Sequence, residues 1–123
     1  MSAANWFNTE RMAYVLRTKQ FTTADGAITY TAKTGRVADS FVVDRVIRVT
    51  TTSTYSLTIT IPDGTHYGQQ LLVIFEVEGG TETITTTPTT GDSGTSLTAA
   101  GGYNRFEWHG DTLGWALIDS SAT

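Results

Sequence analysis

A pair of carboxylates comes closest to reactive chemistry in this chain. Glu76 and Glu78 stand two positions apart at the end of an apolar stretch. If that stretch is a strand, the two side chains share a face and lie roughly 7 Å apart. That separation falls within the range of a glycosidase carboxylate pair. A solvated strand end beside a turn explains the pair better, because the sequence implies no deep pocket, and we expect no catalysis here.

Other catalytic and metal-binding patterns are also missing. His66 and His109 both stand beside turn residues, without a second ligand at a useful spacing for a metal. Asp63-Gly64 and residues 91–94 supply oxygen atoms, but the spacing of an EF-hand is missing and turn formation explains both. The chain has no cysteine, which excludes disulfides and thiolate sites. No glycine-rich phosphate loop or nucleophile elbow is present. The sequence therefore predicts no enzyme activity, no cofactor and no metal.

Aromatic residues offer a different chemistry, because their rings can stack on sugars. The candidates are Tyr55, Tyr67, Tyr103, Trp108 and Trp115. Alternation with polar neighbours assigns Tyr55, Trp108 and Trp115 to a core. Tyr67 and Tyr103 remain free for a role at the surface.

The elements that would position these residues are strands. Residues 55–61 alternate apolar and polar side chains, which is typical of a strand buried on one face. Pro62-Asp63-Gly64 then turns the chain. Residues 71–77 form a nearly continuous apolar run, typical of a strand covered on both sides. Trp108 and Trp115 flank a Gly110-Asp111 turn, so we expect them to meet on the inner face of one hairpin, with Phe106, Leu57 and Ile59.

The whole chain of 123 residues predicts one all-β domain. About eight strands recur at spacings of 8–12 residues, joined by Gly- and Asp-rich turns, with a tight hairpin expected at Glu78-Gly79-Gly80. This pattern predicts a small antiparallel β-sandwich or jelly-roll/barrel. Residues 1–25 differ in composition and are expected to form a distinct N-terminal arm or short helix, followed by the β domain at 26–123. Within residues 37–49, Asp44-Arg45 separates two expected short strands.

Charge is divided unevenly along the chain. Residues 1–48 hold seven of the eight Lys and Arg against four acids, whereas residues 49–123 hold one Arg against eight acids. A nucleic-acid binder would more often be basic throughout a domain, so two surfaces with different partners are expected instead. No apolar run reaches the length of a membrane helix, and residues 1–6 do not read as a signal peptide. We therefore expect neither nucleic acid nor membrane as a partner.

An ordered set of short motifs follows residue 55. Leu57 to Gly64 reads Leu-Thr-Ile-Thr-Ile-Pro-Asp-Gly, and Gly68-Gln69 and an apolar strand follow. Next come Gly79-Gly80, a threonine-rich strand with Pro88, and a glycine-rich loop. The set ends with Ala99-Ala100-Gly101-Gly102-Tyr103, Glu107-Trp108-His109-Gly110 and Gly114-Trp115. Over residues 55–118 this order resembles capsid decoration (cement) proteins and related head-fibre β-domains of tailed bacteriophages.

The resemblance implies a structural role. Such proteins are usually homotrimers on the outer surface of the virion, where they bind the major capsid protein and tie capsomers together, and they have no catalytic residues. The alternative is a glycan-reading module of a tail fibre or adhesin, which exposed aromatics on loops would favour. A long N-terminal arm favours the capsid-binding function, because a cement protein must grip its neighbours.

Two sets of residues are expected to make the contacts. Leu72 and Ile74 lie on the face of their strand opposite Leu71, Val73, Phe75 and Val77, so a neighbouring subunit is expected to cover them. The basic N-terminal part is expected to face the shell while the acidic body faces solvent. The expected capsid-binding residues are Trp6, Phe7, Arg11, Met12, Arg17, Lys19 and Phe21. Alternatively, residues 1–25 pack on their own subunit as an ordinary helix or edge strand.

Overall fold

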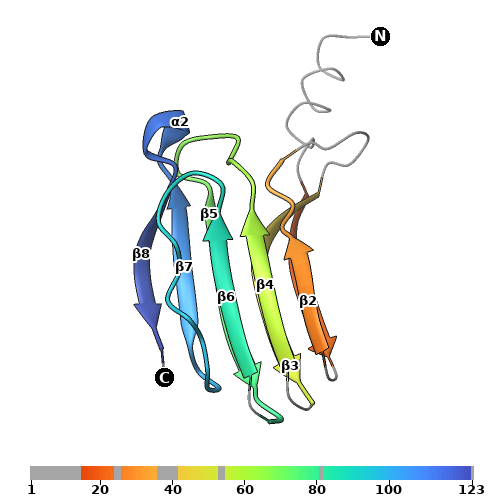
Figure 1. The fold of residues 1–123 in the computed structure, drawn as a ribbon. Helices are drawn as coiled ribbons and strands as arrows, with labels where there is room; N and C mark the ends of the chain where they lie inside the picture. Colours follow the sequence, from red (N-terminus) through yellow and green to blue (C-terminus); the bar gives the residue numbers. More distant parts are fainter. Residues whose placement is uncertain (1–14, 24–25, 36–41, 53–54, 81, 123) are drawn as a thin grey trace, which may run out of the picture.

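A computed structural model describes residues 15–23, 26–35, 42–52, 55–80 and 82–122. The prediction of an all-β chain is confirmed: eight strands and one short helix make up the described part. Sheet A holds β1 (Val15–Thr23), β3 (Val42–Thr51), β5 (Gln70–Val77), β7 (Tyr103–Trp108) and β8 (Trp115–Ser121), in that order. Sheet B holds β2 (Gly26–Thr31), β4 (Tyr55–Ile61) and β6 (Glu82–Pro88) (Figure 1).

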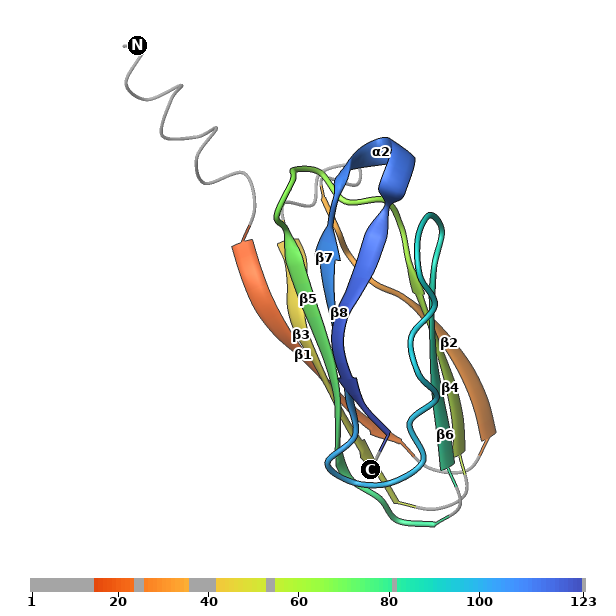
Figure 2. The same ribbon diagram turned by 90° about the vertical axis from the view of Figure 1, so that its left-hand side faces the viewer.

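The first six strands wind as a spiral between the two sheets. The chain crosses to the other sheet at every connection from β1 to β6, so β3 returns beside β1 and β4 beside β2. Neighbouring strands of the spiral are consequently parallel: β1 with β3, β3 with β5, β2 with β4, and β4 with β6. Figure 2 shows the two sheets facing each other. The final strands β7 and β8 add to sheet A in antiparallel fashion.

The predicted antiparallel order is therefore wrong for β1 to β6. The hairpin expected at Glu78-Gly79-Gly80 joins β5 in sheet A to β6 in sheet B, and these strands are not paired with each other. A glycine-rich turn reverses the direction of the chain both in a hairpin and in a crossing between facing sheets. Alternation has the same period in both arrangements. Local sequence signals therefore could not show which strand pairs with which.

The core lies between the sheets. Each central strand contributes every second side chain, as the alternation predicted for residues 55–61. Residues 71–77, whose apolar run predicted a strand covered on both sides, bury one face and leave Leu72 and Ile74 half-buried on the other. The buried residues that form this cluster are Ala32, Ile47, Val49, Leu57, Ile59, Ile61, Leu71, Val73, Phe75, Ile84, Leu97, Phe106, Trp108 and Trp115. Val77 departs from the prediction, since its side chain is 51% exposed at the end of β5.

The β7–β8 hairpin closes one end of the core, and the pairing of its tryptophans is confirmed. Trp108 and Trp115 are opposite one another in the hairpin, with ring centroids 5.5 Å apart. The expected turn is one helical turn, α2 (Gly110–Leu113). The loop after β6 packs on this hairpin so closely that a Cβ at Gly91 would lie 2.2 Å from the Trp115 carbonyl oxygen. Only glycine fits there, at a φ of 120°.

Two N-terminal segments differ from the expected elements. Residues 42–51 form one strand rather than two, because a bulge takes up Arg45 and leaves Asp44 facing inward. Residues 15–23 are extended and pair with β3 as a strand of sheet A, so the described part of the expected arm is not helical.

The outer faces of the two sheets differ in character. Sheet B presents rows of threonine, because Thr29, Thr58 and Thr85 are in register across its three strands. Sheet A presents apolar side chains in its middle, where Val46 on β3 is opposite Leu72 on β5. A threonine surface is readily solvated. A half-buried apolar strip is stabilised when a partner covers it, because apolar area is then removed from water.

Candidate functional site

β1 and β2 are the edge strands of the two sheets and lie at the same end of the fold (Figures 1 and 2). Ile28 is in register with the buried Leu57, so it faces the core, yet its side chain remains 44% exposed. Phe21 and Tyr30 pack against the core from the same two strands and are only partly buried. Their rings meet edge to face with centroids 4.9 Å apart. We call this surface, formed by β1 and β2, the open end.

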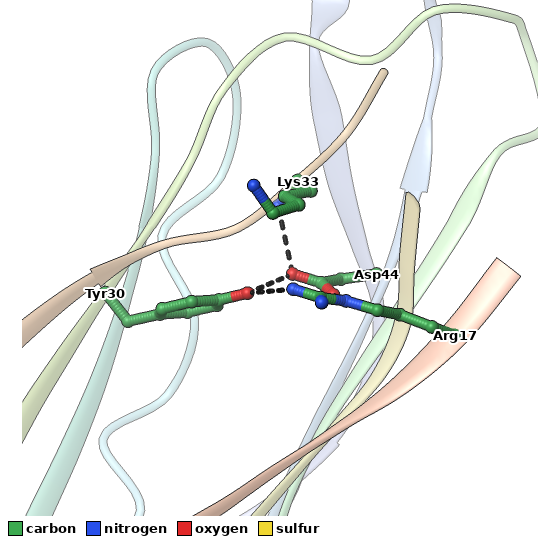
Figure 3. Close-up of polar contacts among 4 residues, drawn as sticks. All are labelled: Arg17, Tyr30, Lys33 and Asp44. Atoms are coloured by element: carbon green, nitrogen blue, oxygen red, sulfur yellow. Dashed lines mark hydrogen bonds and ion pairs between the residues drawn. The ribbon is translucent and has the colours of Figure 1, made fainter. Parts of the chain in front are cut away.

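A buried carboxylate ties the open end together (Figure 3). The Asp44 side chain is fully buried and forms an ion pair with the Arg17 guanidinium, which is about one-third exposed. Its Oδ2 accepts a hydrogen bond of 2.6 Å from the Tyr30 hydroxyl and one of 3.0 Å from the Lys33 amide. Arg17 also donates to the Tyr30 hydroxyl, at 2.8 Å. The cluster thus joins β1, β2 and β3, and both Asp44 carboxylate oxygens have donors.

This cluster predicts a loss of stability at alkaline pH. Burial, followed by the hydrogen bond to Asp44, raises the pKa of Tyr30 to about 12. Because the folded pKa exceeds the usual value near 10, the stabilising effect is complete below pH 10 and is lost as pH rises through about 12. Thermal melts between pH 9 and 12 should therefore show a steeper fall in Tm for the wild type than for Tyr30→Phe. Parallel curves would contradict this coupling.

Three of the expected capsid-binding residues lie together at the open end. Lys19 places its ammonium group 5.1 Å from the Phe21 ring centroid and 5.5 Å from that of Tyr30. Arg17 lies on the same strand and holds Asp44. The other four residues, Trp6, Phe7, Arg11 and Met12, lie outside the described residues. Among the described residues, β1 and β2 carry two cations, Arg17 and Lys19, and no acid of their own, so this end is basic.

The expected subunit-interface residues lie on the outer face of sheet A. Leu72 and Ile74 are half-buried, while their strand neighbours Leu71, Val73 and Phe75 point into the core. Leu72 is in register with Arg105, and Ile74 with Tyr103. Charged side chains on the surrounding strands therefore border the apolar strip, as in the ion pair of 2.9 Å between Arg48 and Glu76.

A row of polar side chains crosses the outer face of sheet A from β3 to β7, near the beginning of β5. Arg45 donates to Gln70 Oε1 at 2.8 Å, and Gln70 Nε2 donates to Glu107 at 3.3 Å. His109 Nε2 lies 2.8 Å from the other Glu107 oxygen. The hydrogen bond with His109 is the largest cause that lowers the pKa of Glu107. The His109 ring stacks on Tyr67, with centroids 5.2 Å apart and planes 7° apart.

The sequence analysis predicted only part of two clusters, the one around Asp44 and the one around Tyr67 and His109. It left Tyr67 free for a surface role, and the Tyr67 side chain is 71% exposed. It did not find the partner His109, which is distant in the chain. Asp44 was interpreted as an interruption between strands. An isolated acid within an apolar strand is a signal of a buried ion pair, but its partners depend on a register that local patterns do not give.

The residues first considered for catalysis do not form a joint site. Glu76 pairs with Arg48 on the outer face of sheet A, and Glu78 is exposed beyond the end of β5. Among the residues with a described position, no three His, Asp or Glu side chains gather as metal ligands. No helix within the described ranges is long and apolar enough to cross a membrane.

Comparison with known protein families and with curated proteins finds no match for this chain. The surfaces of the described residues are therefore the basis for a functional proposal.

Proposed function

We propose that this chain is a structural virion protein that binds the outside of a phage capsid and stabilises contacts between capsomers. The observation that carries the proposal is the open end of the core. The opposite end of the spiral is closed by the β7–β8 hairpin, but at β1 and β2 inward-facing residues such as Ile28 remain exposed. Within the described residues, the outer edges of β1 and β2 have no strand partner, and apolar side chains between them are exposed. A partner that covers this surface would stabilise it by pairing with the edges and burying the apolar side chains.

Charge indicates which kind of partner fits this surface. Among the described residues, β1 and β2 carry Arg17 and Lys19 and no acid of their own, whereas residues 55–122 carry a net charge of −7, from one Arg and eight acids. A second copy placed head to head would bring two basic ends together, which is unfavourable. An acidic protein surface with apolar side chains is the complementary partner, and the proposed one is the major capsid protein. Mixing the chain with undecorated shells tests this, because a decoration protein sediments with them at a saturable ratio.

The same proposal includes a homotrimer that uses the outer face of sheet A. The support is the contrast between the threonine rows of sheet B and the apolar strip around Leu72 and Ile74. Among the residues with a described position, apolar side chains on the outside of the central strands are found in sheet A and not in sheet B. Each subunit would then keep its open end free for the shell.

An aspartate in the strip tests the subunit interface. Ile74→Asp should shift the protein towards monomer, because burying an unpaired charge costs several kcal/mol. Thr58→Asp is the matched control, since Thr58 is a half-buried residue on the outer face of the central strand of sheet B. Light scattering coupled to size-exclusion chromatography gives the mass of each variant. An unchanged oligomer in Ile74→Asp, or equal dissociation in both variants, would contradict the interface.

Glycan binding is the second candidate function, and the stacked pair of Tyr67 and His109 favours it. One face of the Tyr67 ring packs on His109, while most of the side chain faces solvent. A ring held in this way presents an apolar surface beside the polar row of Arg45, Gln70 and Glu107. Such a combination of apolar surface and a few placed polar groups is typical of small-molecule sites.

A further inference from the structure

A pocket of about 220 Å³ lies in sheet A near the beginnings of β1, β3 and β5. It is lined by Leu16, Arg45, His66, Gly68, Gln69 and Gln70. None of these residues is acidic, and two of them, Arg45 and His66, can carry positive charge. The volume is below the usual range for drug-sized ligands, so it suits a single small group.

The floor of the pocket is held by hydrogen bonds. Gln69 is 4% exposed, and its amide nitrogen donates to the Thr34 carbonyl oxygen at 2.9 Å. Its amide oxygen accepts from the Thr65 backbone N–H at 2.8 Å and from the Thr65 hydroxyl at 3.1 Å. The chain enters this floor through Gly68 at a φ of 91°, and the Gly68 N–H donates to the Trp108 carbonyl oxygen. The Gln69 side chain is therefore held in one orientation before any ligand binds.

Arg45 is positioned at this pocket with unused hydrogen-bonding capacity. A guanidinium has five N–H donors, and the contact of Arg45 within the described residues is the one with Gln70. Gln70 is itself fixed by its hydrogen bond to Glu107, which lies on the next strand and pairs with His109. Glu107 thus has its own partner in His109, and within the described part of the chain Arg45 retains donors for an anion. A planar guanidinium recognises a carboxylate through two parallel hydrogen bonds.

Tyr67 connects the pocket to an apolar platform. It stands between His66 and Gly68, both of which line the pocket, and its ring is braced by His109. A braced ring loses little conformational entropy when a ligand stacks on it. The open ring face suits the C–H face of a pyranose, and the adjacent amide of Gln70 suits its hydroxyl groups.

From this arrangement we infer that the pocket binds an acidic saccharide, a sugar that carries a carboxylate. The carboxylate is held by Arg45 and His66, and the sugar ring lies against Tyr67. The inference rests on the second candidate function, glycan binding, and is independent of attachment to a shell. It adds the site and the chemical class of the ligand.

Titration of the purified full chain with acidic monosaccharides tests the inference. Glucuronate, galacturonate and N-acetylneuraminate are the probes, with glucose as the neutral control and sulfate as the plain anion. We expect saturable amide shifts at Gly68 and Gln70 in NMR spectra, with a Kd near the millimolar range for at least one acidic sugar. Tyr67→Ala and Arg45→Gln should each raise this Kd at least tenfold. Arg105→Gln and Tyr103→Ala, on the same face of sheet A, should leave it unchanged, and thermal melts check that all variants fold.

Each remaining outcome overturns the inference. If none of the three acidic sugars shows saturable binding, the pocket does not bind acidic saccharides. Equal affinity for glucose and glucuronate would show that the carboxylate of the sugar does not contribute to binding. Sulfate binding of equal strength that is insensitive to Tyr67→Ala indicates an adventitious anion only. If the chain binds other glycans and Tyr67→Ala leaves that binding intact, glycan recognition stands but lies elsewhere on the molecule.

Discussion

Replacing Trp115 with alanine is expected to lower the free energy of unfolding by about 3–5 kcal/mol. The Trp115 side chain is fully buried, packs on Trp108 and donates from its indole nitrogen to the Pro62 carbonyl oxygen at 2.8 Å. Its backbone also pairs with the loop after β6, where the Asp92 N–H donates to the Trp115 carbonyl oxygen at 2.8 Å. Truncation would leave a large cavity between the hairpin and that loop. The measurement is denaturant unfolding followed by circular dichroism.

A nearby exposed residue supplies the control for this prediction. Leu113 is 66% exposed in α2, two positions before Trp115, so Leu113→Ala should change stability by less than about 0.5 kcal/mol. Trp115→Ala should lower Tm by roughly 10–20 °C at this chain length. A shift as small as that of Leu113→Ala would mean that Trp115 does not organise the closed end of the core.

Removing the guanidinium of Arg17 is expected to cost about 3 kcal/mol, although the residue is partly exposed. In Arg17→Met the fully buried Asp44 carboxylate keeps the Tyr30 hydroxyl and the Lys33 amide but loses its opposite charge. An uncompensated buried charge is more costly than a lost surface contact. Combining Arg17→Met with Asp44→Asn should recover part of the loss, since the buried charge is then removed.

The ion pair of Arg48 and Glu76 provides the matched comparison. Its side chains are 45% and 29% exposed, so Arg48→Met should change stability by less than about 1 kcal/mol. Both substitutions remove an arginine from sheet A and insert the same side chain. Equal losses in the two variants would show that Asp44 does not depend on Arg17.

Alternation and turn chemistry were enough to predict the strands but not their pairing. Residues 55–61 and 71–77 were placed correctly, and the separation of Leu72 and Ile74 from the core follows from a period of two. The parallel spiral was missed because each turn signal fits a hairpin and a crossing between sheets equally well. Pairing of β1 with β3, or β2 with β4, depends on contacts across the whole fold.

Side-chain partners were harder to predict for the same reason. Asp44 meets Arg17 and Tyr30 only because β1 and β3 are parallel and β2 lies in the facing sheet. Tyr67 stacks on His109 only because β5 pairs with β7. Both clusters join residues that are distant in the chain, so no local spacing could reveal them. The tryptophan pair was predicted because a single hairpin positions it.

Sedimentation of the chain with undecorated shells, assembled from the major capsid protein of the same phage, tests the central claim most directly. We expect the wild type to sediment with the shells at a saturable ratio. Lys19→Glu should bind roughly tenfold more weakly, because it reverses a charge over the Phe21 and Tyr30 rings at the open end. Thr87→Glu introduces an acidic side chain at an exposed position of β6 in sheet B, away from the open end and from the proposed subunit interface, and should bind as the wild type does. A wild type that stays in the supernatant, or equal weakening by both variants, would contradict the account.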